Sequence, residues 1–173
     1  MPHYGVFIDP SEYRRNNFDF TGDRLAALVE LASNDSIALL QTDVSISEVQ
    51  NLIRRNMEAA CEALGKSALA PMKSVNDDRL GLIRNPPTAA ELAQLLTDQF
   101  LDHMRSGDYT TLEVSNVDPA VIFDAYFNGR PPFDSQKKKM EFPDAFTLER
   151  LVMWAVENDL TVCVVGPDPD LVH

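Results

Sequence analysis

The first apolar run of the chain reads Val6-Phe7-Ile8-Asp9-Pro10-Ser11. An unbroken run of bulky and β-branched residues is typical of a strand that is buried on both faces. The Asp-Pro pair ends the run, because an aspartate before a proline favours a turn. The stretch therefore predicts a buried first strand that carries Asp9 at its carboxyl end and leads into a polar loop over residues 11–20.

Strands and helices alternate along the rest of the chain. Apolar runs at residues 37–40 and 161–165 predict two further strands, and residues 111–114 are an ambiguous short strand. Helical spacing of apolar residues behind a capping residue or a proline predicts the helices. These helices start after Thr21, at the capping-box pattern Ser45 to Glu48, after Thr88, at Pro119 and at Pro143. We therefore expect an α/β fold, a three-layer sandwich with a central, mainly parallel β-sheet flanked by helices.

Size and composition are those of an ordinary globular chain. Of the 173 residues, 45% are hydrophobic and 24% are charged, so we expect a single domain over residues 1–173. The net charge of −12 argues against a protein that binds nucleic acid by electrostatic attraction alone, since that mode needs excess cations. An acidic chain can still act on nucleic acid when divalent cations lie between its carboxylates and the phosphates.

A few single residues carry predictions about packing and compartment. Cys61 and Cys163 are too few for a disulfide framework, and Cys163 is expected to be a small buried residue within its apolar run. We expect His103 on a helix surface and Trp154 in the core or at an interface. The chain shows no secretory signal and no apolar stretch near the roughly 20 residues of a membrane span, so the cytoplasm is the expected compartment.

Four acidic residues are predicted to meet at one edge of the sheet. They are Asp9, Glu48, Asp144 and Asp168. Each follows a strand or stands early in a helix, and the carboxyl ends of parallel strands share an edge where ligands usually bind. Gathering carboxylates is unfavourable unless cations neutralise them, and hard ions such as Mg²⁺ or Mn²⁺ prefer oxygen ligands.

Each of these residues also has a simpler explanation. Asp9 and Asp168 stand in turn sequences, Glu48 can be the partner of Ser45 in a capping box, and Asp144 can complement a helix dipole. These four explanations are independent of one another, whereas one metal site accounts for all four positions together.

The sequence also resembles the PIN domain family, a fold of many metal-dependent ribonucleases. The resemblance is carried by residues 6–11, by Glu48 early in a helix, by Glu141-Phe142-Pro143-Asp144-Ala145 and by residues 164–170. It implies metal-ligand roles, and hence catalytic roles, for Asp9, Glu48, Asp144 and Asp168. Ser11 and Asp170 would be accessory residues. Pro10 and Gly166 depart from the family pattern, which weakens the support around the ligands.

The resemblance further implies an activity and partners. We expect a divalent-metal-dependent endoribonuclease that uses Mg²⁺ or Mn²⁺ on RNA, including single-stranded nucleic acid. The sequence looks most like a bacterial branch of the PIN domain family, and the family includes toxins of toxin–antitoxin pairs. A protein inhibitor or antitoxin and a second copy of the chain are therefore further expected partners. The candidate phosphate-binding residues are Arg130, Lys137, Lys138 and Lys139. The chain stops three residues after Asp170, so we expect either a missing C-terminal extension or unusually short last elements.

Two other classes of function stay open. One is a degenerate, non-catalytic PIN-like interaction or scaffold module, whose acidic surface attracts a basic partner. The other is a phosphoacceptor domain that uses Asp9 or Asp168. The second is disfavoured because the last strand ends at Val165 and Gly166 without the lysine that such a site needs.

Overall fold

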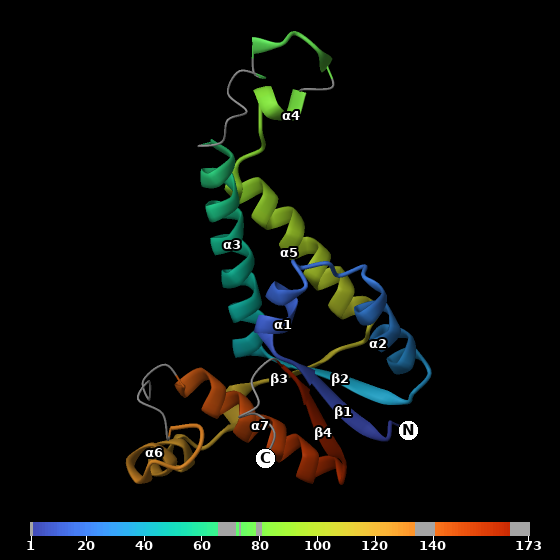
Figure 1. Cartoon of the computed structure of the whole chain (residues 1–173). Coiled ribbons are helices and arrows are strands. Elements are labelled where there is room, and N and C mark those ends of the chain that lie inside the picture. The colour runs from blue at the N-terminus through green and yellow to red at the C-terminus, as the bar shows by residue number, and fades with distance from the viewer. Residues whose placement is uncertain (1, 66–71, 73, 79–80, 134–140, 167–173) are drawn as a thin grey trace.

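A computed structural model describes residues 2–65, 72, 74–78, 81–133 and 141–166. Its centre is a parallel sheet in the order β3-β2-β1-β4 (Figure 1). The bounds are β1 Tyr4–Ile8, β2 Ile37–Thr42, β3 Thr110–Leu112 and β4 Thr161–Val165. All of the strand pairs in this sheet are parallel, so the predicted sheet is confirmed.

The first apolar run forms the middle of this sheet. Val6 lies opposite Leu39 of β2 on one side and opposite Cys163 of β4 on the other. Val6, Phe7 and Ile8 are all buried, as an unbroken apolar run predicts for a strand covered on both faces. Asp9 follows directly, at the carboxyl end of the central strand.

The larger helical layer covers one face of the sheet. It consists of α1 (Pro10–Arg15), α2 (Asp23–Ser33), α3 (Asp43–Gly65) and α5 (Ala89–Ser106). Its core joins Ile8 of β1 to Tyr13, Val49, Ile53 and Phe100 of the helices. The helices α3 and α5 pack along each other as a long hairpin that rises from the sheet, with the short α4 (Gly81–Arg84) above it (Figure 1).

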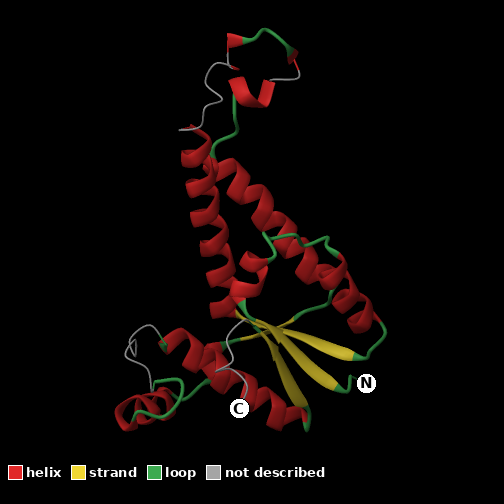
Figure 2. Cartoon of the chain, in the orientation of Figure 1, coloured by secondary structure: helices red, strands yellow, loops and turns green. Residues whose placement is uncertain are grey.

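The third layer lies on the opposite face, which makes the fold the three-layer sandwich that the sequence predicts (Figure 2). Here α7 (Phe142–Asn158) packs Leu151 and Trp154 against Phe7 and Leu40. The 3₁₀ turn Val114–Asn116 and α6 (Pro119–Asn128) lie beside the start of α7. Among the described helices, none is both long enough and apolar enough to cross a bilayer.

Two predictions about the chain before α2 are wrong in detail. The expected loop over residues 11–20 begins with α1, for which Asp9 is the N-cap and Pro10 the first residue. Proline suits this position because its fixed φ matches the helix and its missing N–H needs no partner there. The N-cap of α2 is Gly22 rather than Thr21, whose hydroxyl instead donates to Asp19 Oδ1 at 3.0 Å.

The predicted capping box from Ser45 to Glu48 is also wrong. Helix α3 already begins at Asp43, so Ser45 lies inside its first turn. The hydroxyl of Ser45 donates to Gln41 Oε1 at 2.6 Å and accepts from the Thr42 backbone N–H at 2.9 Å. Glu48 is consequently free of a capping role.

Two predictions about single side chains are corrected. Cys163 is exposed, because β4 is an edge strand and alternate residues of it face away from the covered side. His103 is buried, its Nε2 lies 3.0 Å from the Tyr109 hydroxyl, and burial lowers the pKa of its imidazole. Trp154 is buried in the core, as predicted.

Candidate acidic site

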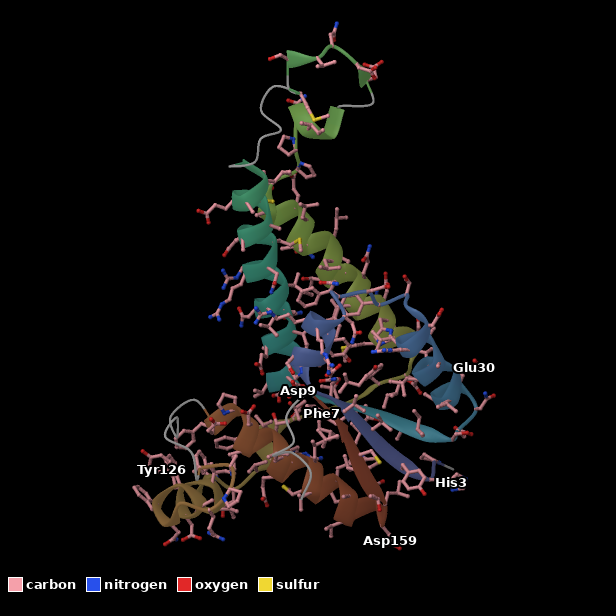
Figure 3. The ribbon with its side chains drawn as sticks, in the orientation of Figure 1. His3, Phe7, Asp9, Glu30, Tyr126 and Asp159 are labelled. Atoms are coloured by element: carbon pink, nitrogen blue, oxygen red, sulfur yellow. The ribbon has the colours of Figure 1, made fainter. Side chains whose placement is uncertain are left out.

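Asp9 reaches the site from the end of the central strand (Figure 3). Its backbone N–H donates to Val165 O at 2.9 Å, which ties it to the end of β4. Its Oδ1 accepts the backbone N–H of Ser11 at 2.8 Å and also the Ser11 hydroxyl. The carboxylate is therefore fixed by the first turn of α1 through its Oδ1 atom.

Glu48 and Asp144 approach Asp9 from two different helices. Glu48 lies in the second turn of α3, and Asp144 lies in the first turn of α7, next to Pro143. All three carboxylates line one small cavity of about 20 Å³. Its other lining residues are Phe7, Pro10, Ser45, Thr147 and Leu148. Three of the four predicted acidic residues thus meet at the carboxyl edge of the sheet.

The three carboxylates interact electrostatically. Burial raises the pKa of Asp144 to about 7, and the charges of Glu48, Glu141 and Asp9 add to this shift. Burial and the charge of Asp9 also raise the pKa of Glu48. A raised carboxyl pKa means that the folded protein destabilises the negative charge, so the cluster lacks a compensating cation among the described groups.

The chemistry of this donor set fits a hard divalent cation. All three groups are carboxylates, and the charge repulsion between them is what a bound cation removes. Within the described ranges, however, no group of three or more His, Cys, Asp or Glu side chains is arranged so that it could hold a metal ion. Asp168 and Asp170 lie outside the described residues, and the place of the expected fourth ligand is not defined.

A buried polar network supports the cavity from below. Ser45 lies at its centre and joins Gln41 and Thr42 of β2, while Thr42 Oγ1 lies 3.1 Å from Thr147 Oγ1 of α7. These bonds connect the end of β2 to the helix that carries Asp144. They hold the two helices α3 and α7 at a fixed spacing where their acidic residues face each other.

Sequence analysis missed three residues at this site. Glu141 hydrogen-bonds to Asp144, and Ser45 and Thr147 line the cavity. One signal was available, because all three stand three residues from a predicted acidic residue, a spacing that puts both on one face of a helix. Glu141 does not line the cavity, but its charge and its hydrogen bond raise the pKa of Asp144.

A larger groove adjoins the acidic cavity. It has a volume of about 440 Å³ and runs along α3 from Pro143 at the start of α7. Its lining residues are Asp43, Val44, Ser47, Glu48, Asn51, Leu52, Arg55 and Pro143. Glu48 belongs to both hollows, so the groove opens directly onto the carboxylates.

The predicted phosphate-binding residues are not placed at this site by the structure. Arg130 forms an exposed ion pair with Asp124 of α6. Lys137, Lys138 and Lys139 lie outside the described residues. Their predicted role in binding nucleic acid stays a prediction.

Comparison with known proteins identifies the family. A model of the PIN domain family matches residues 6–170, which is nearly the whole chain. No curated protein and no solved structure matches the chain.

Proposed function

Because the chain belongs to the PIN domain family, whose members are generally nucleases with acidic metal sites, we propose that it is a divalent-metal-dependent endoribonuclease. The observation that supports this most is the meeting of Asp9, Glu48 and Asp144 in one cavity at the carboxyl edge of the sheet. The raised pKa values of Glu48 and Asp144 are those of a site that a cation would stabilise.

Different residues of the chain have different roles in the proposed phosphodiester hydrolysis. Asp9, Glu48 and Asp144, with Asp168, would hold Mg²⁺ or Mn²⁺. When bound, such an ion acts as a Lewis acid that lowers the pKa of water and offsets charge on the phosphate oxygens. Ser11 fixes the orientation of Asp9, and the polar network under Ser45 fixes the helix that carries Asp144. Glu48 is the most exposed of these three acidic residues, so it would hold the ion on the side that faces the groove.

The departure at Pro10 does not weaken this arrangement. Proline at the first position of α1 leaves Asp9 as the N-cap and keeps its carboxylate bound to Ser11. We include RNA as the substrate, a protein inhibitor and a second copy of the chain as partners, and the cytoplasm as the compartment in the same proposal, on the family resemblance.

Isosteric substitutions that each remove one negative charge, at the two ends of α7, test the nuclease proposal. We expect Asp144→Asn to reduce Mn²⁺-dependent cleavage of a labelled oligoribonucleotide by at least about 100-fold, since it removes a carboxylate from the cavity. Asp159→Asn is the matched control, because Asp159 ends the same helix in a left-handed conformation that asparagine also adopts (Figure 3). Equal cleavage by Asp144→Asn and the parent protein would contradict the proposal and indicate a contaminating nuclease.

A non-catalytic scaffold is the second candidate, favoured by the lack of a complete set of metal ligands among the described residues. A scaffold without a metal site predicts no thermal stabilisation by Mn²⁺, whereas the nuclease predicts stabilisation that Asp144→Asn removes. A thermal-shift titration of both proteins with Mn²⁺ separates these two functions.

A further inference from the structure

The groove beside the acidic cavity follows one face of α3. Val44, Glu48, Asn51 and Arg55 lie three or four residues apart, so they stand on successive turns of one helix face. Glu48 and Arg55 are about 10 Å apart along the helix axis, at a rise of about 1.5 Å per residue. The face therefore runs from the carboxylates to a cation.

Two neighbouring arginines of α3 differ in their surroundings. Arg54 forms an ion pair with Glu58 at 3.0 Å and does not line the groove. Arg55 lines the groove, and within the described part of the chain it takes part in no salt bridge. Among the described residues none accepts a hydrogen bond from its guanidinium, whose donors are therefore available to a ligand on this side of the groove.

The other charged group near the start of the groove is already satisfied. Asp43 Oδ1 accepts backbone N–H groups from Val44 at 3.0 Å and from Val114 at 3.1 Å. The remaining lining offers an amide at Asn51 and apolar surface at Val44, Leu52 and Pro143. A cation, an amide donor and apolar walls together suit a sugar-phosphate chain better than a free cation or an apolar ligand.

We propose that this groove is a phosphate subsite for single-stranded RNA, in which Arg55 binds a backbone phosphate next to the one at the carboxylates. The proposal rests on the nuclease function. It adds the path of the bound strand, which runs from the acidic cavity along α3 toward the tip of the α3–α5 hairpin. Arg55 does not touch the reacting phosphate, so it is a positioning residue. Asn51 adds a donor to the same strand.

Binding of RNA at varied salt tests the subsite without cleavage. The probe is a fluorescein-labelled oligouridylate, measured by anisotropy in EDTA at salt concentrations between about 0.05 and 0.4 M. We expect Arg55→Ala to weaken binding about fivefold at about 0.1 M salt and to lower the slope of log K against log salt by about 0.7, the value for one phosphate contact with a single strand. Arg55→Lys retains the charge and should recover most of the slope.

Arg54→Ala is the matched control, since it removes the same charge from the adjacent position. We expect it to leave both the affinity and the salt slope near those of the parent protein. In Mn²⁺-dependent cleavage, Arg55→Ala should raise KM about fivefold with kcat unchanged, because a distant phosphate contact binds ground state and transition state alike. Circular dichroism and thermal melts check that both variants fold.

The outcomes separate the subsite from the nuclease function. Equal affinity and equal salt slope for Arg55→Ala and Arg54→Ala, or no RNA binding by the parent protein, would overturn the subsite. If Asp144→Asn cleaves as well as the parent while Arg55→Ala alone loses affinity, the nuclease function fails and the groove stands as a binding site. If Asp144→Asn is inactive and the two arginine variants have equal affinity and equal salt slope, the nuclease function stands and the phosphate subsite fails.

Discussion

Folding places the negative charge of the Asp144 carboxylate in an unfavourable environment. Burial of the carboxyl in the cavity raises its pKa to about 7, and three neighbouring acidic groups add to this shift. In the unfolded chain the same group has an ordinary pKa near 3.8. Between these two values the folded state binds more protons than the unfolded state, so the free energy of unfolding falls as pH rises.

The first prediction concerns the stability of Asp144→Asn without metal. At about pH 8 the parent carries the full electrostatic penalty, so the variant should be more stable by roughly 1 kcal/mol once solvent screening is allowed for, or about 2–4 °C in Tm. Below about pH 3 the Asp144 carboxyl of the parent is largely neutral in both the folded and the unfolded state, and the difference between parent and variant should disappear. Thermal melts in EDTA at both pH values measure this. A variant less stable than the parent at the higher pH would show that the carboxylate is compensated by a group outside the described residues.

At the scale of elements, the helix ends show how capping residues act. Thr88 accepts the Glu91 backbone N–H at 3.2 Å, and Glu91 Oε2 accepts the Thr88 backbone N–H at 2.8 Å, which completes a capping box for α5. Thr21 has a similar sequence context before α2, yet its hydroxyl bonds to Asp19 and caps nothing.

The second prediction compares these two threonines. Thr88→Ala should lower the free energy of unfolding by about 1 kcal/mol, since it leaves helix N–H groups without a partner. Thr21→Ala should change it by less than about 0.5 kcal/mol. Urea denaturation of both variants measures the difference. A larger loss for Thr21→Ala would mean that the chain before α2 is held by its hydroxyl more than by the helix itself.

The packing of α7 on the sheet depends on a glycine. A Cβ atom at Gly5 would lie 2.6 Å from Trp154 Cζ3 and 2.9 Å from Leu40 Cδ1, both closer than non-bonded atoms approach. The missing side chain lets the indole ring of α7 lie directly on β1.

The third prediction follows from this contact. Gly5→Ala should reduce the free energy of unfolding by roughly 1–3 kcal/mol, because a side chain there forces Trp154 out of its position. Gly65→Ala is the control, since Gly65 ends α3 with nothing within 4 Å of the added atom. It should be neutral or slightly stabilising. Equal effects of the two substitutions would contradict the close approach of α7 to β1.

The elements were largely predictable because apolar periodicity and turn residues are local signals. Continuous apolar runs identified β1, β2 and β4, and proline and threonine marked the starts of α5, α6 and α7. The errors arose at side chains that can form a hydrogen bond with more than one partner. Ser45 bonds to Gln41 across the end of β2, and His103 is buried against Tyr109, contacts that form only after the elements pack.

At the scale of the whole molecule, strand order decides which residues meet. The rule that parallel strands share their carboxyl edge is enough to predict that Asp9, Glu48 and Asp144 converge. Local sequence could not distinguish Arg54 from Arg55, because the rotation of α3 about its axis is set by packing of Val49 and Ile53 against the core. The positions of Asp168 and Asp170 stay predictions.

The fourth prediction is a pH dependence of metal binding, measured on global unfolding. A cation can bind the cavity only when the carboxylates are ionised, and Asp144 is largely protonated below its pKa of about 7. Stabilisation by Mn²⁺ should therefore be larger at about pH 8 than at about pH 6, by several degrees in Tm at saturating metal. Asp144→Asn should show little stabilisation at either pH. An equal Mn²⁺ effect at both pH values would place the ion elsewhere.

The parallel sheet also has a consequence for biosynthesis. Among the described strands, β1 is translated before β2 and β4, yet it lies between them in the sheet. Asp9 is made early, but its backbone is anchored by Val165 and its cavity is closed by α7. A nascent chain therefore has no assembled acidic cavity until α7 and β4 have both been translated and have packed onto β1.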